Sequence, residues 1–227
     1  MKNLVFIALV FLTSKIYSQE MKTDWANILK YSNENQNLQV PSKNEKRVVF
    51  MGNSITEGWK MSSPEFFSQN KYINRGISGQ TTSQMLVRFR PDVIALKPKL
   101  VVILAGINDI AQNNGPIELK DVFGNIVSMA ELAKINNIKV ILSSVLPAND
   151  FSWKKGMEPA EKVIQLNSML EKYASENKIP FVNYYLKMVD SEKGLDKKYT
   201  NDGVHPTLAG YKVMEPILQE AILKALK

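Results

Sequence analysis

The sequence contains no cysteine and only one histidine, His205, among its 227 residues. The absence of cysteine excludes disulfide bonds, thiolate metal sites, a thiol nucleophile and a lipid-modified cysteine anchor. A single imidazole also excludes a zinc site built on two or three histidines. No loop dense in carboxylates indicates an all-oxygen magnesium or calcium site. We therefore expect chemistry that uses neither a metal nor a cofactor.

The chain also lacks blocks of like charge and glycine-rich phosphate loops. Its formal net charge is +7, but lysine and arginine are scattered among aspartate and glutamate. Nucleic-acid binding needs basic side chains gathered on one face, so we expect no nucleic-acid partner. Neither a G-x-G-x-x-G nor a Walker motif occurs, so nothing in the sequence indicates a bound nucleotide.

Only one long apolar run occurs, and it lies at the start of the chain. Lys2 precedes the apolar residues 4–12, and residues 14–19 turn polar. This order is typical of a secretory signal peptide, and the run is too short for a stable transmembrane helix. We predict a signal peptide over residues 1–18, export to the periplasm or the cell exterior, and no stable membrane insertion after cleavage. An uncleaved membrane anchor is the alternative.

The remaining chain is predicted to form one domain. Residues 20–45 are mostly polar and predict a lead-in with a short helix, whereas residues 46–227 carry the main core. Short runs rich in Val, Ile, Leu or Phe predict buried strands at 47–51, 72–74, 100–105, 139–142 and 180–183. Apolar residues recurring every three to four positions predict helices between them, with a break at Pro91 and a kink or restart at Pro216. Alternating strands and helices predict a three-layer α/β/α sandwich with about five parallel strands.

Five polar or glycine residues lie beyond the ends of predicted strands: Ser54, Gly76, Asn108, Asp202 and His205. Ligand sites in open α/β sheets lie at the carboxyl ends of the strands, so we expect all five at one edge. Together they supply a nucleophilic hydroxyl, a general base with an orienting carboxylate, and two donors for an oxyanion. That equipment is typical of acyl transfer through a covalent intermediate.

Each of these residues also has a structural interpretation. Ser54 can be an ordinary helix N-cap, and Asn108 can cap the following residues or form an Asx turn. Gly76 can simply permit a positive φ angle. A lone histidine is usually structural, but His205 follows Asp202 by three positions in a glycine-containing loop. This spacing favours a carboxylate that orients the imidazole.

The segments around these residues resemble the four sequence blocks of the GDSL-type, or SGNH, hydrolase superfamily, over residues 48–211. The matching segments are Gly52-Asn53-Ser54-Ile55-Thr56, Asn74-Arg75-Gly76-Ile77-Ser78-Gly79, Gly106-Ile107-Asn108-Asp109 and Asp202-Gly203-Val204-His205-Pro206. Asn53 and Ile55 stand where the family name has Asp and Leu. The resemblance is closest to the single-domain acetylhydrolase-like branch and implies a flavodoxin-like sheet.

The resemblance implies that Ser54 is the nucleophile and that His205 is the base oriented by Asp202. It implies that the Gly76 amide and the Asn108 side chain form the oxyanion hole. The expected activity is that of a serine esterase on short-chain, mainly acetyl, esters. A thioesterase or lysophospholipase of the same fold is the alternative, although no long apolar insertion supplies a lid. A non-catalytic carbohydrate-binding module would not need the three catalytic residues at one edge.

Two segments after strands are expected to overhang this edge, residues 111–116 and 146–159. The second carries Phe151 and Trp153, and the first carries amide side chains at positions 112, 113 and 114. Aromatic faces beside amide groups suit a carbohydrate ester, because rings stack on sugar faces and amides bind hydroxyls. Packing of the two aromatic residues beneath their loop is the alternative.

Overall fold

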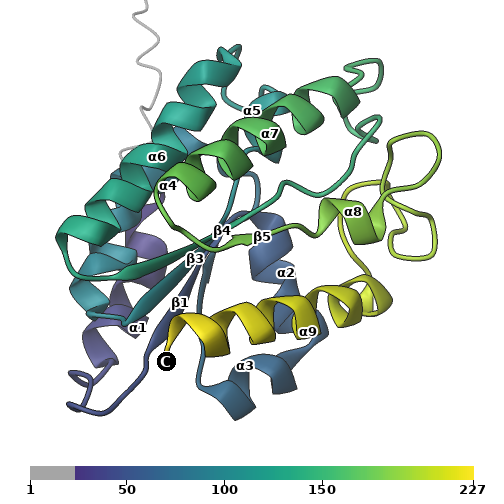
Figure 1. The fold of residues 1–227 in the computed structure, drawn as a ribbon. Helices are drawn as coiled ribbons and strands as arrows, with labels where there is room; N and C mark the ends of the chain where they lie inside the picture. The colour runs from purple at the N-terminus through teal and green to yellow at the C-terminus, as the bar shows by residue number, and fades with distance from the viewer. Residues whose placement is uncertain (1–23) are drawn as a thin grey trace, which may run out of the picture.

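Residues 24–227 are described by a computed structural model of the chain (Figure 1). The predicted signal peptide, residues 1–18, lies outside the described residues. Within the described part of the chain, no helix combines the length and the apolar character needed to cross a membrane.

A single sheet of five parallel strands forms the centre of the molecule, in the order β2-β1-β3-β4-β5. The strands are β1 (Val48–Gly52), β2 (Ile73–Gly76), β3 (Leu100–Leu104), β4 (Lys139–Ser143) and β5 (Phe181–Val182). Every residue of β1 and β3 is buried, as expected for central strands of a parallel sheet covered on both faces. The strands lie where the apolar runs predicted them, and each end falls within two residues of its predicted position.

Helices cover both faces of the sheet. Figure 1 shows α4, α6 and α7 over one face and α2, α3 and α9 over the other, which confirms the predicted three-layer sandwich. The helices are η1 (Ile28–Tyr31), α1 (Ser32–Asn37), α2 (Ser54–Ser62), α3 (Pro64–Asn70), α4 (Thr82–Asp92), η2 (Ile94–Leu96), α5 (Ile107–Ile110), α6 (Leu119–Ile135), α7 (Ala160–Glu176), α8 (Tyr185–Met188) and α9 (Leu208–Ala225).

The two prolines predicted to interrupt helices behave differently. Pro91 lies in the last turn of α4, which ends one residue later, so the predicted break is present. Pro216 lies inside α9, which continues without a restart. A proline costs the helix one backbone hydrogen bond. The buried stripe of Met214, Leu218 and Ile222 holds both halves of α9 against the sheet and offsets that loss.

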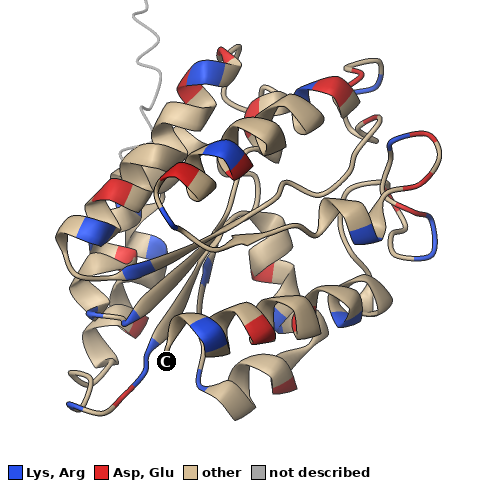
Figure 2. Ribbon diagram, in the orientation of Figure 1, with Lys and Arg blue, Asp and Glu red and all other residues tan. Residues whose placement is uncertain are grey.

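Charged side chains are distributed over the helices and loops. Figure 2 shows lysine and arginine interspersed with aspartate and glutamate in the view drawn. Several pair along one helix, as Lys224 does with Glu220 and Lys212 does with Glu215. An exposed pair such as Lys224 with Glu220 contributes little to stability, so the fold is held mainly by its buried core.

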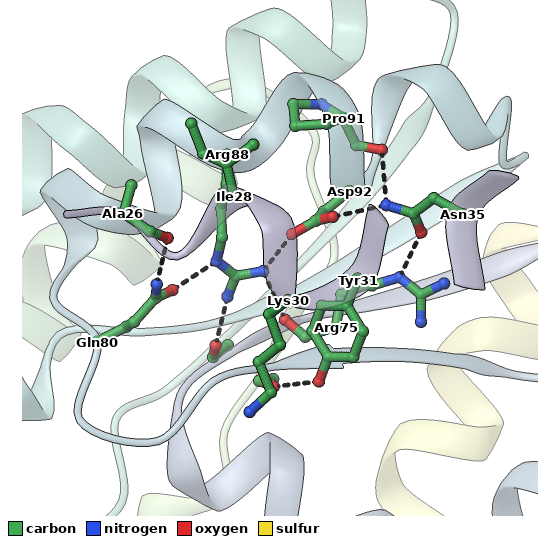
Figure 3. A network of polar contacts seen from close by, with 12 residues as sticks. Ala26, Ile28, Lys30, Tyr31, Asn35, Arg75, Gln80, Arg88, Pro91 and Asp92 are labelled. Atoms are coloured by element: carbon green, nitrogen blue, oxygen red, sulfur yellow. Dashed lines mark hydrogen bonds and ion pairs between the residues drawn. The ribbon is translucent and has the colours of Figure 1, made fainter. Parts of the chain in front are cut away.

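The lead-in is bound to the main domain by polar contacts (Figure 3). The Tyr31 hydroxyl donates to the carbonyl of Gly76, and the Arg75 guanidinium lies 4.5 Å from the centre of the Tyr31 ring. Asn35 donates to Asp92 at 2.7 Å and accepts from Arg75 Nε at 2.9 Å. Tyr31 and Arg75 are buried, so these interactions are strengthened by the low local dielectric and fix the lead-in in place.

The carboxyl ends of the strands meet at one edge of the sheet. Gly52 ends β1 in register with Gly76 of β2 and with Leu104 of β3. The chain leaves this edge directly before Ser54 and, after β3, just before Asn108. Residues far apart in the sequence therefore start from neighbouring positions in space.

Candidate active site

Three of the predicted residues form one continuous chain of hydrogen-bonding atoms. Ser54 Oγ lies 2.8 Å from His205 Nε2, and His205 Nδ1 lies 2.6 Å from Asp202 Oδ2. The His205 side chain is 39% exposed, so the group lies on open surface rather than in a deep tunnel. The arrangement can pass a proton from the hydroxyl to the imidazole while the carboxylate fixes the ring.

The segment before Ser54 explains why its hydroxyl is free for this contact. Asn53 is the N-cap of α2, because its Oδ1 accepts from the amide of Ile55 at 3.0 Å. Ser54 is the first residue inside the helix, and its interpretation as the N-cap is therefore wrong. Gly52 permits the tight turn, since a Cβ there would lie 2.0 Å from Thr56 Oγ1.

The loop after Asp202 holds both the carboxylate and the imidazole. Asp202 Oδ1 accepts from the amides of Val204 at 2.9 Å and His205 at 2.8 Å, which leaves Oδ2 for the ring. Thr200 Oγ1 accepts from the amides of Asp202 and Gly203 and closes the turn. This local hydrogen-bonding pattern explains how a spacing of three residues brings the carboxylate beside the imidazole.

The Asp202 carboxylate is ionised at neutral pH. Partial burial raises its pKa, but hydrogen bonds from the His205 amide and ring and from the Val204 amide outweigh burial and lower the pKa to about 2. A permanent negative charge beside Nδ1 stabilises an imidazolium.

Asn108 lies in the one-turn helix α5, at the same edge, and is buried. Its Nδ2 donates to the carbonyl of Gln80 at 3.0 Å. An amide NH₂ group has two hydrogens, so the second remains available to an oxyanion. The interpretation of Asn108 as a simple cap is not supported, because no side-chain capping bond is formed at α5.

The neighbouring Asp109 anchors the segment that follows β2. Its carboxylate accepts from the Thr82 amide at 3.0 Å and from Thr82 Oγ1 at 2.6 Å, at the start of α4. Burial raises the pKa of Asp109 to about 6, although the bonds from Thr82 oppose this shift. Asn108 and Asp109 thus hold residues 80–82 from two consecutive positions.

Gly76 does not present a free amide. Its N–H donates to Asn74 Oδ1 at 2.9 Å, so it is already engaged and not available to an oxyanion. Its φ angle is not positive, so the alternative explanation from backbone conformation also fails. A Cβ at this position would lie 2.2 Å from the amide nitrogen of Glu57, and Gly76 therefore permits the close approach of α2 to β2. This is a correction to the role predicted for Gly76.

Gly79, which the sequence did not single out, has the positive φ angle and the available backbone amide that were considered for Gly76. Its φ angle is +77°, and its amide has no hydrogen-bond partner among the residues that the structure describes. The adjacent Ser78 donates through its amide to Glu57 Oε2 at 2.7 Å, which ties this loop to the first turn of α2. The dipeptide Ser78-Gly79 is itself a turn signal and could have indicated the position.

The fully buried side chain of Arg88 ties these parts together (Figure 3). Its guanidinium donates to the carbonyls of Gly52 at 3.0 Å and Arg75 at 2.9 Å, and to Asp92 at 2.9 Å. It also donates to the side chain of Gln80. The ends of β1 and β2 and the loop that carries Gly79 are therefore fixed to one another.

The two aromatic residues after β4 have separate positions. Trp153 is 46% exposed, and its ring centre lies 6.1 Å from that of His205. Phe151 is fully buried and stacks on Trp153 at 5.1 Å. Packing beneath the loop is therefore correct for Phe151, while Trp153 flanks the imidazole. Lys154 Nζ donates to the carbonyl of Ala111 at 3.0 Å and joins this loop to the loop after β3.

Comparisons with known proteins agree with an esterase. Residues 50–213 match the model of the GDSL-like Lipase/Acylhydrolase family. Esterase TesA of Pseudomonas aeruginosa is 29% identical over 182 residues, which cover 78% of this chain and 82% of that protein. An acetylxylan esterase of Geobacillus stearothermophilus is 27% identical over 150 residues, or 63% of this chain and 68% of that protein. The crystal structure of a GDSL-like lipase from Bacteroides thetaiotaomicron VPI-5482 is 57% identical with a TM-score of 0.87, covering 88% of this chain and 98% of that one.

Proposed function

Because the chain belongs to the GDSL-like lipase/acylhydrolase family and is a carboxylic ester hydrolase, we propose that it cleaves short-chain esters through an acyl-enzyme on Ser54. The observation that carries this proposal is the unbroken contact from Ser54 Oγ through both nitrogens of His205 to Asp202. A hydroxyl, an imidazole and an ionised carboxylate in this order make a serine nucleophile at neutral pH.

Acylation begins with the neutral imidazole. Asp202 holds the proton on Nδ1, so Nε2 accepts the Ser54 proton while Oγ forms a bond to the ester carbonyl carbon. The carbonyl electron pair moves onto oxygen, and the tetrahedral intermediate then collapses as the carbon–oxygen bond to the alcohol breaks. His205 returns its proton to the leaving alcohol. Water, deprotonated by the same imidazole, then releases the acid and restores the hydroxyl.

Three donors are proposed to bind the oxyanion. They are the second N–H of the Asn108 amide, the backbone amide of Ser54, and the amide of Gly79 in place of that of Gly76. Ser54 is the first residue of α2, so its amide has no partner within the helix, and the positive end of the helix dipole faces the same point. The engaged Gly76 amide supports this assignment, as does the Gly79 amide, which has no partner within residues 24–227.

For the substrate we propose an acetyl ester of a carbohydrate. The exposed His205 and the Trp153 ring beside it suit a bulky, polar alcohol at the position where the imidazole protonates the leaving oxygen. Similarity to an acetylxylan esterase supports the same substrate class. A lysophospholipid or long-chain acyl thioester would instead call for an extended apolar surface that holds the acyl chain, whereas the exposed His205 and the Trp153 ring favour a polar alcohol.

A panel of esters tests this proposal. Acetylated xylo-oligosaccharides and 4-nitrophenyl acetate should be hydrolysed, and rates should fall along the series from acetate to octanoate. Trp153→Ala should raise KM for the acetylated sugar more than for 4-nitrophenyl acetate, whereas equal losses would mean that Trp153 only supports its loop. Faster hydrolysis of lysophospholipids or acyl thioesters than of any acetate would overturn the substrate assignment.

We also propose export with removal of residues 1–18, on the strength of the apolar run behind Lys2. Cleavage after Ser18 removes two lysines and lowers the formal charge from +7 to +5. The mass of the protein recovered from expressing cells tests this directly. A mature chain that begins at Gln19 is expected, and a chain that retains Met1 in the membrane fraction would contradict it.

A further inference from the structure

A hollow of about 510 Å³ lies between the lead-in and the loop after β2. Its wall is formed mainly by Asp24, Trp25, Asn27, Gly79, Gln84 and Asn114. Ser54, Asn108 and His205 do not line it, so the reaction itself does not take place there. The hollow nevertheless begins at Gly79, the residue whose amide is proposed to bind the oxyanion.

Trp25 forms an exposed aromatic wall on a backbone that is held in place. Its side chain is 50% exposed, while its carbonyl accepts from Gln84 Nε2 at 2.8 Å. The carbonyl of the next residue, the buried Ala26, accepts from Gln80 Nε2 at 2.6 Å. Asp24 accepts from two amides of the following turn and fixes the other side. Isolated apolar side chains are common on protein surfaces, but this one lines a hollow and has an anchored backbone.

The chemistry of the wall indicates what the hollow binds. Among residues 24–227, no lysine or arginine lines it and Asp24 does, which disfavours a phosphate or a carboxylate. Most of the lining side chains are polar, which disfavours an acyl chain. Among the described residues, the side-chain amide of Asn27 and Oδ1 of Asn114 have no hydrogen-bond partner. An aromatic face with free amide donors and acceptors suits a sugar ring.

The hollow and Trp153 lie on opposite sides of the nucleophile. Gly79 follows β2 and Trp153 follows β4, and these two strands lie on opposite sides of β1, which Ser54 follows. Ser78 is bonded to Glu57 in the first turn of α2, so the hollow borders the helix that Ser54 begins. A chain of sugars that has one ring at Ser54 can therefore extend along this edge toward Trp25.

We propose that this hollow is a distal subsite for one sugar ring of an acetylated oligosaccharide whose reacting ring lies at Ser54. The inference rests on the proposed function and adds to it that the substrate is a chain of sugars rather than a monosaccharide. The proposal predicts that the effect of Trp25 on KM depends on the number of sugar rings in the substrate, because only a longer oligosaccharide reaches Trp25.

Kinetics on substrates of different length provide the first test. Trp25→Ala should raise KM for acetylated xylotetraose up to about tenfold more than KM for acetylated xylose, which is the effect of losing one stacked ring. Trp25→Phe should recover most of the loss. Leu29→Ala is the matched control, since Leu29 is 69% exposed on the same lead-in but does not line the hollow. An equal effect of Trp25→Ala on both substrates would overturn the proposal.

A binding measurement separates this proposal from the catalytic one. Calorimetric titration of the Ser54→Ala variant with unacetylated xylotetraose should show binding that weakens about tenfold when Trp25→Ala is added. If Ser54→Ala retained hydrolysis, the proposed nucleophile would fail while the Trp25 effect on binding could still hold. If xylotetraose bound equally well with and without Trp25, the subsite would fail while the esterase mechanism stood.

Discussion

The adjacent residues Asn53 and Ser54 have different roles, since Asn53 caps a helix and Ser54 contacts the imidazole of His205. Asn53 Oδ1 accepts from the Ile55 amide at 3.0 Å and caps α2, whereas Ser54 Oγ lies 2.8 Å from His205 Nε2. Serine is a common N-cap, and at this position the residue before it has taken that role. The pair therefore allows stability and catalysis to be altered independently.

Substituting the two residues in turn should give opposite results. Ser54→Ala removes the nucleophile but no capping bond, so turnover should fall more than about ten-thousandfold with little change in the free energy of unfolding. Asn53→Ala removes the cap and should lower the free energy of unfolding by about 1 kcal/mol while leaving measurable turnover. Urea denaturation and ester hydrolysis on both variants check this. A folded Ser54→Ala enzyme with normal turnover would remove Ser54 from its role.

Asp202→Asn should disable the imidazole without unfolding its loop. Asparagine keeps one oxygen for the amides of Val204 and His205, but it presents an NH₂ group to His205 Nδ1 and favours the wrong tautomer. A loss in kcat of up to about 10⁴ is expected, the size typical of a wrong histidine tautomer in a Ser-His-Asp triad. Thr200→Val is the control, because its hydroxyl bonds the same loop and Asp202 Oδ1 but contacts neither the ring nor Oδ2. A loss for Thr200→Val as large as that for Asp202→Asn would mean that only loop order matters.

The oxyanion donors can be told apart by two measurements. Asn108→Ala should lower turnover about 100- to 1000-fold, the usual effect of losing one such donor. Nuclear magnetic resonance of a phosphonate adduct should show a downfield shift of the Gly79 amide proton and little change at Gly76, whose amide is already bonded to Asn74. A shift at Gly76 without one at Gly79 would restore the role predicted from the sequence.

The raised pKa of Asp109 predicts that this residue stabilises the folded protein more at low pH than at high pH. Burial raises the pKa of its carboxyl from 3.8 to about 6, so the folded protein holds this proton more tightly than the unfolded chain. The resulting stabilisation is fully present below about pH 3.8 and is lost as the pH rises through about 6, in total about 3 kcal/mol. Asp109→Asn keeps an acceptor for Thr82 but cannot titrate. Its free energy of unfolding relative to wild type should therefore increase between pH 4 and pH 8, and parallel urea-denaturation curves would contradict this.

The positions of most candidate site residues could be predicted from the sequence, because these residues follow the ends of strands. Ser54, Asn108, Asp202 and His205 could be expected at one edge because a parallel sheet brings the carboxyl ends of its strands together. The role of Gly76 could not be predicted correctly, because the Asn74 side chain that engages its amide and the Glu57 backbone that packs against it are set by tertiary structure.

The contacts of the lead-in could not be predicted from local sequence patterns either. Its polar composition predicted a short helix and an extended segment, and nothing in that composition indicated the buried contacts of Tyr31 or the hollow beside Trp25. Those features arise from partners about 45 to 60 positions away, such as Gly76 and Gln84. Pairings at such separation have no local periodicity to reveal them.

The most direct test of a catalytic Ser54 is covalent labelling with a serine-directed fluorophosphonate, followed by mass spectrometry of the peptides. The wild-type enzyme should gain one adduct, on the peptide that contains Ser54, and lose ester hydrolysis in proportion to labelling. Ser54→Ala should gain no adduct, and His205→Ala should label far more slowly because the hydroxyl has lost its base. An adduct on a different serine, or full hydrolysis by a protein that is never labelled, would contradict the mechanism.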